Sequence, residues 1–538
     1  MHQWIQSIIF DLARQLRWSF LPPLMVYLAA GVSGLTAIVG AFFVKDYLGL
    51  SAAFLASLGF WVGIPWALKM PIGHVVDLIW RWKAVLVYLG ASLIALSLAM
   101  MYGLIAHTQA FAALAPVEAW YVASALLAPV GYVVQDVVAD AMTVEAVPSV
   151  DGQGRPYPEA EIKGMHTTMQ TLGRFAIITG VVLVAALNIV MFNEIKTMSE
   201  ADKVRIYANI YLMAQAIPVI SILGVTLGGV IWRQRMARLR QQGFGKLEAE
   251  RLLGQPVEAT RPNWWILGGS LVFVVFTLSL GLSDYAWSQE VIFAGSMAIV
   301  LFLLQRLLLE LKSDVRRALV GTALIIFVFR AVPLPGAGLT WFEIDVLGFD
   351  QRFLSVLSLI ASCLALVGMV VLRPLMASRS LAYLVALLTI AGGILFLPNI
   401  GLYYGVHHWT AVMTGGIVDA RFIAIIDTAV ESPLGQVAMI PMLAWIARNA
   451  PAHLKATFFA VMASFTNLAL SASSLGTKYL NQIFIVTREV RDRTTGSVQG
   501  VADYTELGWL LIMVTLIGVL VPLAIIWLVQ HSRYRTSQ

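Results

Sequence analysis

Charge and cysteine are both scarce in this sequence. Of its 538 residues only 12% are Asp, Glu, Lys or Arg, whereas a soluble domain has about 25%. So few charges cannot cover a surface that faces water, which excludes a soluble enzyme, a nucleic-acid-binding protein and a disordered chain. The one cysteine, Cys363, permits neither an internal disulfide nor a cysteine-based metal cluster.

Apolar residues make up 59% of the chain and gather in long continuous runs. A helix needs about 20 apolar residues to cross the roughly 30 Å hydrocarbon layer of a bilayer. Fourteen runs reach this length and predict an all-α polytopic membrane protein. The runs are 19–44, 51–69, 84–106, 119–141, 165–191, 208–232, 264–284, 288–311, 317–336, 353–373, 380–398, 421–447, 455–480 and 507–530. The segment 399–418, rich in tyrosine and histidine, fits either an interfacial loop or a short re-entrant helix.

The spacing of the runs predicts five parts. An amphipathic segment (1–18) precedes an N-terminal six-helix half (19–232), a basic cytoplasmic linker (233–263), an inserted helix pair (264–311) and a C-terminal six-helix half (312–538). With the N-terminus inside the cell, 24 of the 36 Lys and Arg residues fall on the cytoplasmic side and 8 outside. Because basic loops remain in the cytoplasm, we expect both termini there and a location in the cell (inner) membrane.

A charged motif follows the second run. Gly73 allows close helix approach, and Asp77 can pair with Arg81 or with a neighbouring helix end. Together with Lys83 these residues predict a cytoplasmic gate that is made in one conformation and broken in another. An ordinary basic anchor flanked by tryptophans is the alternative. The motif resembles the loop motif of the major facilitator superfamily, which implies two six-helix halves.

Longer stretches resemble one branch of that superfamily, the folate–biopterin transporters. These stretches are 65–73, 135–145, 341–349 and 439–467. They lie in both halves, so the resemblance extends over most of the chain apart from the inserted pair. It implies an alternating-access transporter of folate or a pterin.

Ionisable residues inside the runs are the strongest functional signal, because a charge at mid-membrane costs about 2.5–3.5 kcal/mol on insertion scales. In run 119–141, Asp136 and Asp140 lie four residues apart on one helix face, where mutual repulsion favours proton uptake. In run 165–191, Arg174 lies near mid-depth and is the natural partner of Asp136. Such a pair fits either a switch or a permanent structural salt bridge.

The second half of the chain also has ionisable residues inside its apolar runs. Arg330 lies near mid-depth and is followed at once by Pro333 and Pro335, which break a helix and leave backbone groups unpaired. An arginine before such a break suits a carboxylate or phosphate. Asp427 and Glu431, four residues apart beside another proline, are candidates for proton coupling. Alternatively, Glu431 neutralises Arg330.

Other signals are weaker. Gln170 and Asn467 offer polar groups to a solute but are typical of helix–helix contacts. Two adjacent histidines lack a third ligand at a useful spacing, so we expect no metal. The pair Gly31 and Gly34 is typical of helix packing. Without a phosphate-binding loop, ATP is not expected to drive the protein.

These observations predict a secondary-active transporter, not an enzyme, that moves an anionic small solute by alternating access with proton coupling. The candidates for solute binding are Arg174, Arg330, Gln170 and Asn467, those for proton coupling Asp136, Asp140, Asp427 and Glu431, and those for the cytoplasmic gate Gly73, Asp77, Arg81 and Lys83. A muropeptide-type permease and a non-transporting membrane assembly factor on the same fold are the alternatives. The expected partners are the solute, a proton or other coupling ion, and lipid; neither nucleic acid nor a cofactor is expected.

Overall fold

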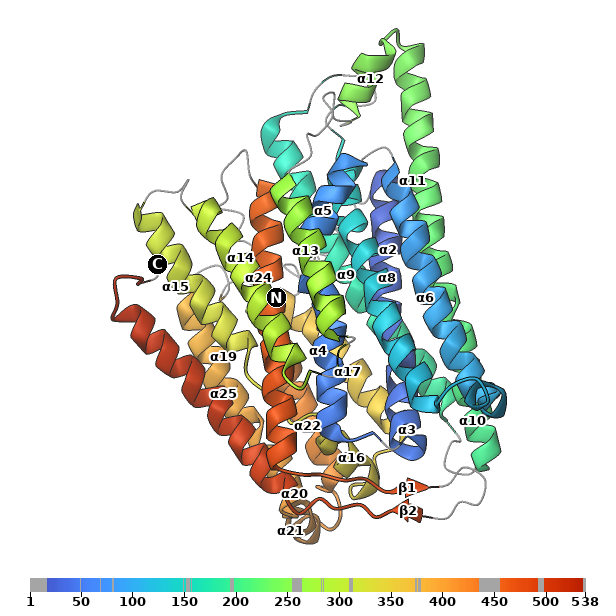
Figure 1. Ribbon diagram of the computed structural model, residues 1–538, viewed down its shortest axis with the longest axis vertical. Coiled ribbons are helices and arrows are strands. Elements are labelled where there is room, and N and C mark those ends of the chain that lie inside the picture. The colour runs from blue at the N-terminus through green and yellow to red at the C-terminus, as the bar shows by residue number, and fades with distance from the viewer. Residues whose placement is uncertain are drawn as a thin grey trace. The chain divides into compact units, whose positions relative to one another are not determined.

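The computed structural model is made almost wholly of helices (Figure 1). It describes residues 17–535 except 49, 68, 80–81, 149, 151–154, 156, 194–197, 254–263, 282, 284, 309–312, 373–374, 376–378, 435–454 and 492–497. The predicted amphipathic segment 1–18 therefore lies almost entirely outside the described residues.

Eight helical segments within the described part of the chain are long and apolar enough to cross a membrane. They are Trp18–Lys45, Lys83–Ala106, Val117–Asp140, Leu172–Met191, Ala201–Gln241, Gln351–Met369, Leu381–Tyr403 and Leu507–Gln530. Shorter apolar helices occur at Ala52–Trp66 and Ser288–Phe302. The predicted all-α polytopic class is confirmed, and the total of fourteen spans stays a prediction.

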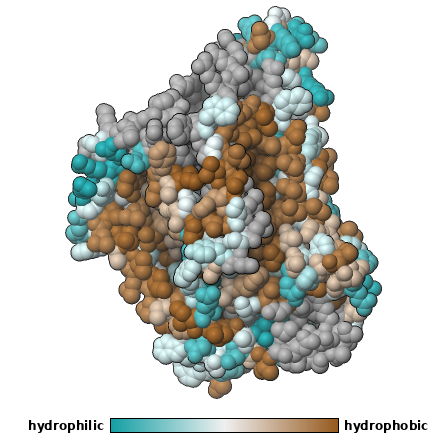
Figure 2. Space-filling view, viewed as in Figure 1, coloured by the Kyte–Doolittle hydropathy of each residue, from teal (hydrophilic) through white to brown (hydrophobic). Residues whose placement is uncertain are grey.

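Apolar side chains face outward along these helices, the reverse of a soluble protein. Leu89 and Leu96 are about half exposed on one helix, and Val219 and Leu223 on another. In Figure 2 the hydrophobic surface runs along the middle of the helices, and hydrophilic surface gathers at helix ends, for example around α12 (Lys246–Leu252). Lipid is the solvent that such a surface needs.

The chain divides into two compact units. Unit 1 comprises 1–36, 71–187 and 199–268, and unit 2 comprises 37–70, 188–198 and 269–538. Residues 37–70 pack within unit 2, although they precede most of unit 1 in the sequence. The predicted division into halves and an inserted pair stays a prediction.

Unit 1 contains most of the helices of the first half of the chain. They are η1 (Trp18–Phe20), α2 (Leu21–Val32), η2 (Ser33–Thr36), α5 (Lys69–Leu78), α6 (Lys83–Ala106), α7 (Thr108–Ala112), α8 (Val117–Ala146), α9 (Glu159–Met191), α10 (Glu200–Ala214), α11 (Ala216–Gln241) and α12, with the start of α13 (Trp264–Gly281). Small residues bring α6 against α8. A Cβ on Gly90 would lie 2.6 Å from the carbonyl oxygen of Gly131, and the hydroxyls of Ser97 and Ser124 are 2.9 Å apart.

Unit 2 contains the remaining elements. They are α3 (Ala37–Tyr47), α4 (Ala52–Ala67), α14 (Ser288–Leu308), α15 (Ser313–Arg330), α16 (Ala337–Asp345), α17 (Gln351–Val371), α19 (Leu381–Leu395), α20 (Leu397–Tyr403), α21 (Val406–Met413), α22 (Ala420–Glu431), η5 (Ser432–Leu434), α24 (Lys455–Ile483), β1 (Val490–Arg491), β2 (Val498–Gly500) and α25 (Leu507–Gln530). The two strands pair antiparallel. Asp350 and Asp419 cap α17 and α22 by accepting hydrogen bonds from backbone N–H groups of the first turn. The segment 399–418 forms α20 and α21, which meet at Gly405 with φ of 78°.

Gly31 on α2 packs closely against the backbone of α9. A Cβ there would overlap the carbonyl oxygen of Ile177 on α9, whereas a Cβ on Gly34 would meet nothing within 4 Å. We expect Gly31→Ala to lower the free energy of unfolding by about 1–3 kcal/mol. Gly34→Ala is the matched control and should leave it almost unchanged. Thermal melting of both variants in detergent tests this; equal melting temperatures would contradict the packing.

Candidate functional site

In unit 1, three of the predicted charged site residues lie near one buried tyrosine, Tyr27. The hydroxyl of Tyr27, on α2, donates a 2.7 Å hydrogen bond to Oδ1 of Asp140 on α8. Tyr27 also lies within electrostatic range of Asp136 and Arg174. A Cβ on Gly173 would lie 2.9 Å from the Tyr27 ring, so α9 brings Arg174 alongside. Sequence reasoning missed Tyr27, because an isolated tyrosine in an apolar run is indistinguishable from an interfacial one.

The predicted gate is only partly described. Gly73 packs against α8, where its Cβ position lies 3.9 Å from Cγ1 of Val137. Lys83 begins α6 and is half-buried. The side chain of Asp77 and the whole of Arg81 lie outside the described residues, as does the side chain of Gln170. The gate therefore stays a prediction.

Unit 2 contains a broken helix at the position that the prolines predict. α15 ends at Arg330 and α16 begins at Ala337, with φ of 77° at Gly336. Side chains of α24 pair with the freed backbone groups. Ser473 donates to the carbonyl of Val332 at 2.6 Å, the N–H of Leu334 donates to Oγ1 of Thr477 at 2.9 Å, and Asn481 donates to the carbonyl of Pro335 at 3.1 Å.

Arg330 stands directly before this break and is half-buried. It has neither a hydrogen bond nor an ion pair with any residue that the structure describes. Among the described residues, Arg330 forms no ion pair with Glu431, so neutralisation of Arg330 by Glu431 is not observed. A buried guanidinium retains its charge and needs an anionic partner, so this position is suited to an anion.

Carboxylates gather on α16 and α22. Oδ2 of Asp427 accepts a 2.9 Å hydrogen bond from Asn399, whereas its buried Oδ1 has no partner among the described residues. The charges of Glu343 and Glu431 both act on Asp427. Glu343 lies within the stretch 341–349 but was not singled out from the sequence. Its signal was available, because it is an acidic residue between apolar neighbours.

A second charged network links α3, α16 and the chain before α25. Lys45 forms an ion pair with Asp345, and the side chains are 8% and 19% exposed. The Tyr504 hydroxyl donates to the other oxygen of Asp345 at 2.5 Å. Burial, reinforced by this hydrogen bond, raises the pKa of Tyr504, so its phenol keeps the donated proton at physiological pH.

Arg488 completes this network. Its guanidinium donates to the carbonyl of Lys45 at 2.8 Å and to that of Leu50, and lies 4.6 Å from the centre of the Trp341 ring. Arg488 is one of the eight Lys and Arg residues that the predicted topology places outside the cell. Its burial and its contacts with backbone carbonyls and Trp341 indicate a structural role in this network.

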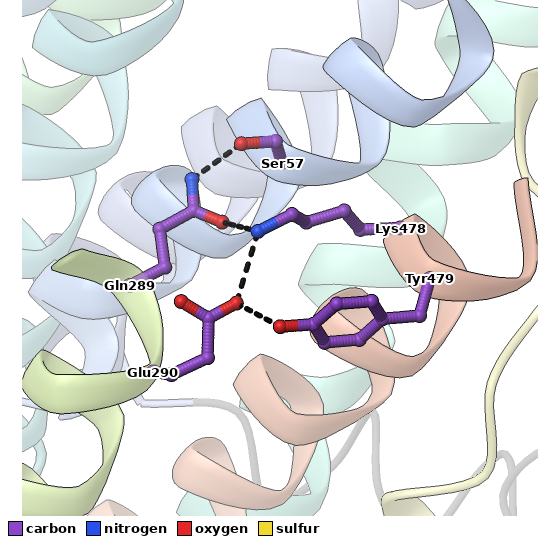
Figure 3. Close-up of polar contacts among 5 residues, drawn as sticks. All are labelled: Ser57, Gln289, Glu290, Lys478 and Tyr479. Atoms are coloured by element: carbon purple, nitrogen blue, oxygen red, sulfur yellow. Dashed lines mark hydrogen bonds and ion pairs between the residues drawn. The ribbon is translucent and has the colours of Figure 1, made fainter. Parts of the chain in front are cut away.

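α14, the second helix of the predicted inserted pair, is anchored by polar contacts that the sequence did not reveal (Figure 3). Lys478 of α24 donates to Oε1 of Glu290 on α14 at 3.0 Å and to Gln289 at 3.2 Å. Tyr479 also donates to Glu290, and Gln289 donates to Ser57 on α4. The Lys478–Glu290 ion pair therefore joins α14 to α24, and the Gln289–Ser57 hydrogen bond joins α14 to α4.

Asn467 lies on the same helix as Lys478. Its amide donates a 3.0 Å hydrogen bond to the carbonyl of Trp66 on α4. This contact joins two helices, α24 and α4. A role for Asn467 in solute binding stays a prediction.

The fold is of the major facilitator type, as the likeness to solved membrane transporters shows. A POT family transporter, solved in complex with a thioalcohol-conjugated peptide, superposes with a TM-score of 0.59 over 96% of both chains at 12% identity. The nucleoside transporter NupG (D323A mutant) gives a TM-score of 0.55 at 11% identity, covering 95% of this chain and 99% of its own. A D-xylose–proton symporter gives 0.51 at 13% identity over 97% of both.

Sequence comparison gives the family. Residues 30–537 match the BT1 family, so the chain belongs to this family of folate–biopterin transporters. A folate-biopterin transporter of Synechocystis sp. is 27% identical over 146 residues. That match spans 27% of this chain and 28% of the relative. The resemblance seen in the sequence motifs is thereby confirmed.

Proposed function

We propose that this transporter carries an anionic small solute of the folate or pterin class by secondary-active alternating access. The observation that carries the proposal is Arg330, a half-buried guanidinium beside a broken helix, without a partner among the described residues. A planar guanidinium matches the geometry of a carboxylate. The name of the Synechocystis relative supports the same class of solute.

Proton coupling is part of the proposal. Asp427 and Glu431, joined by Glu343, would take up a proton in unit 2, and Asp136 and Asp140 would do so in unit 1. Two nearby carboxylates cannot both ionise without cost, which makes one of them a proton acceptor. Arg174, Gln170 and Asn467 would contribute to solute binding.

Conformational control would involve the cytoplasmic side. Gly73, Asp77, Arg81 and Lys83 would form the gate. The protein would lie in the cell membrane with both termini in the cytoplasm, as its distribution of basic residues favours.

Uptake into liposomes that contain the purified protein tests the solute class. We expect labelled folate or biopterin to enter faster than into empty liposomes, and labelled muropeptide to enter at the empty-liposome rate. Entry of muropeptide but not of folate or biopterin would contradict the proposal. Failure of all three solutes, with correctly folded protein, would favour a non-transporting role.

A further inference from the structure

One face of α24 carries a row of polar side chains that the proposed function does not use. Ser473, Thr477 and Asn481 are spaced four residues apart, so they lie on one helix face on successive turns. All three are at most 6% exposed. Each contacts a different backbone group of the segment 331–336, which joins α15 to α16.

These three side chains form hydrogen bonds with backbone groups of the broken segment 331–336. A broken helix inside a membrane leaves N–H and C=O groups without water, and each unsatisfied group is costly. Here the carbonyls of Val332 and Pro335 and the N–H of Leu334 all pair with α24. One neighbouring helix therefore holds three polar backbone groups of the segment.

Close contacts reinforce the hydrogen bonds. A Cβ on Gly476 would lie 3.2 Å from Cβ of Pro333, and a Cβ on Gly336 would lie 3.0 Å from Nδ2 of Asn481. Both glycines let the segment lie directly against α24. We therefore expect the segment, and with it the end of α15, to keep its position against α24.

We infer that Ser473, Thr477 and Asn481 are positioning residues that hold Arg330 in place through the segment 331–336. Arg330 is the last residue of α15 and adjoins this segment directly. The consequence for transport rests on the proposed role of Arg330 in solute binding. The positioning itself does not depend on that role, because it concerns only the geometry of the break between α15 and α16.

Cysteine accessibility tests the positioning without any solute. The chain has one cysteine, Cys363, so Arg330→Cys in a Cys363→Ser background gives a single thiol at the site. We expect Thr477→Val, which leaves the Leu334 N–H without its acceptor, to change the rate of thiol modification by a charged methanethiosulfonate at least about fivefold. Thr477→Ser keeps the hydroxyl and should preserve the rate.

A matched control lies on the same helix. Thr466 is buried and donates only to the carbonyl of Ala463 in its own helix, at 3.0 Å. Thr466→Val makes the same chemical change away from the break and should leave the thiol rate unaltered. Ser473→Ala frees the Val332 carbonyl and serves as a second test if Thr477→Val does not fold. Equal rates in all folded variants would overturn the inference.

Transport kinetics separate this inference from the proposed function. With Arg330 intact, we expect Thr477→Val to raise KM for folate at least about fivefold while kcat changes less, and Thr477→Ser to restore KM. A changed thiol rate with an unchanged KM would sustain the positioning and refute solute binding by Arg330. An unchanged thiol rate would refute the positioning whatever the KM.

Discussion

Replacing Arg330 with alanine is expected to lower kcat/KM for folate uptake by roughly 30-fold or more. Truncating one partner of a desolvated charge pair costs about 2–5 kcal/mol, and each 1.4 kcal/mol is a factor of ten. Arg330→Lys should give a kcat/KM between those of wild type and Arg330→Ala, because lysine keeps the charge but loses the planar fork of donors. Initial uptake rates over a range of folate concentrations give the measurement.

The control for Arg330 is a second arginine of unit 2. Arg352 is exposed in the first turn of α17, and Arg352→Ala should keep the wild-type rate. If Arg330→Ala transports folate as well as wild type does, the guanidinium is not the anion site. A fall in rate for both variants would point to a general loss of charge rather than to a site.

Reversing either charge of the Lys45–Asp345 ion pair is expected to lower the stability of the protein strongly. The two side chains are only 8% and 19% exposed, and breaking a buried pair leaves an uncompensated charge that costs about 3 kcal/mol or more. Lys45→Asp and Asp345→Lys should each lower the melting temperature in detergent. The double variant restores opposite charges and should recover most of the loss.

A surface pair provides the matched comparison. Asp202 and Arg205 lie 3.1 Å apart, with side chains 47% and 75% exposed. Because exposed pairs contribute about 0–1 kcal/mol, Asp202→Lys should shift the melting temperature little. Failure of the Lys45–Asp345 double variant to recover any stability would show that the contact between these two charges is not what stabilises α3 against α16.

Features set by local chemistry could be predicted from the sequence. Proline removes a backbone donor wherever it stands, so Pro333 and Pro335 predicted the break that follows Arg330. Long apolar runs predicted the helices, since length and hydropathy alone decide whether a segment can cross lipid. Short motifs in both halves indicated the family.

Features that depend on which helices meet could not be predicted. The ion pair of Lys478 could not be foreseen, because its partner Glu290 is 188 residues away in the sequence. The same holds for Arg488, whose acceptor carbonyls at Lys45 and Leu50 are 443 and 438 residues away. Gly31 and Gly34 look equivalent in sequence, and only Gly31 faces a neighbouring backbone.

Accumulation driven by a proton gradient distinguishes proton-coupled transport of folate from passive equilibration. Proteoliposomes with an imposed inward proton gradient are incubated with labelled folate, with and without a protonophore. Secondary-active transport predicts that folate inside rises above the concentration outside, and that the protonophore abolishes this excess. Folate that only equilibrates to the outside concentration, gradient or not, would contradict the account.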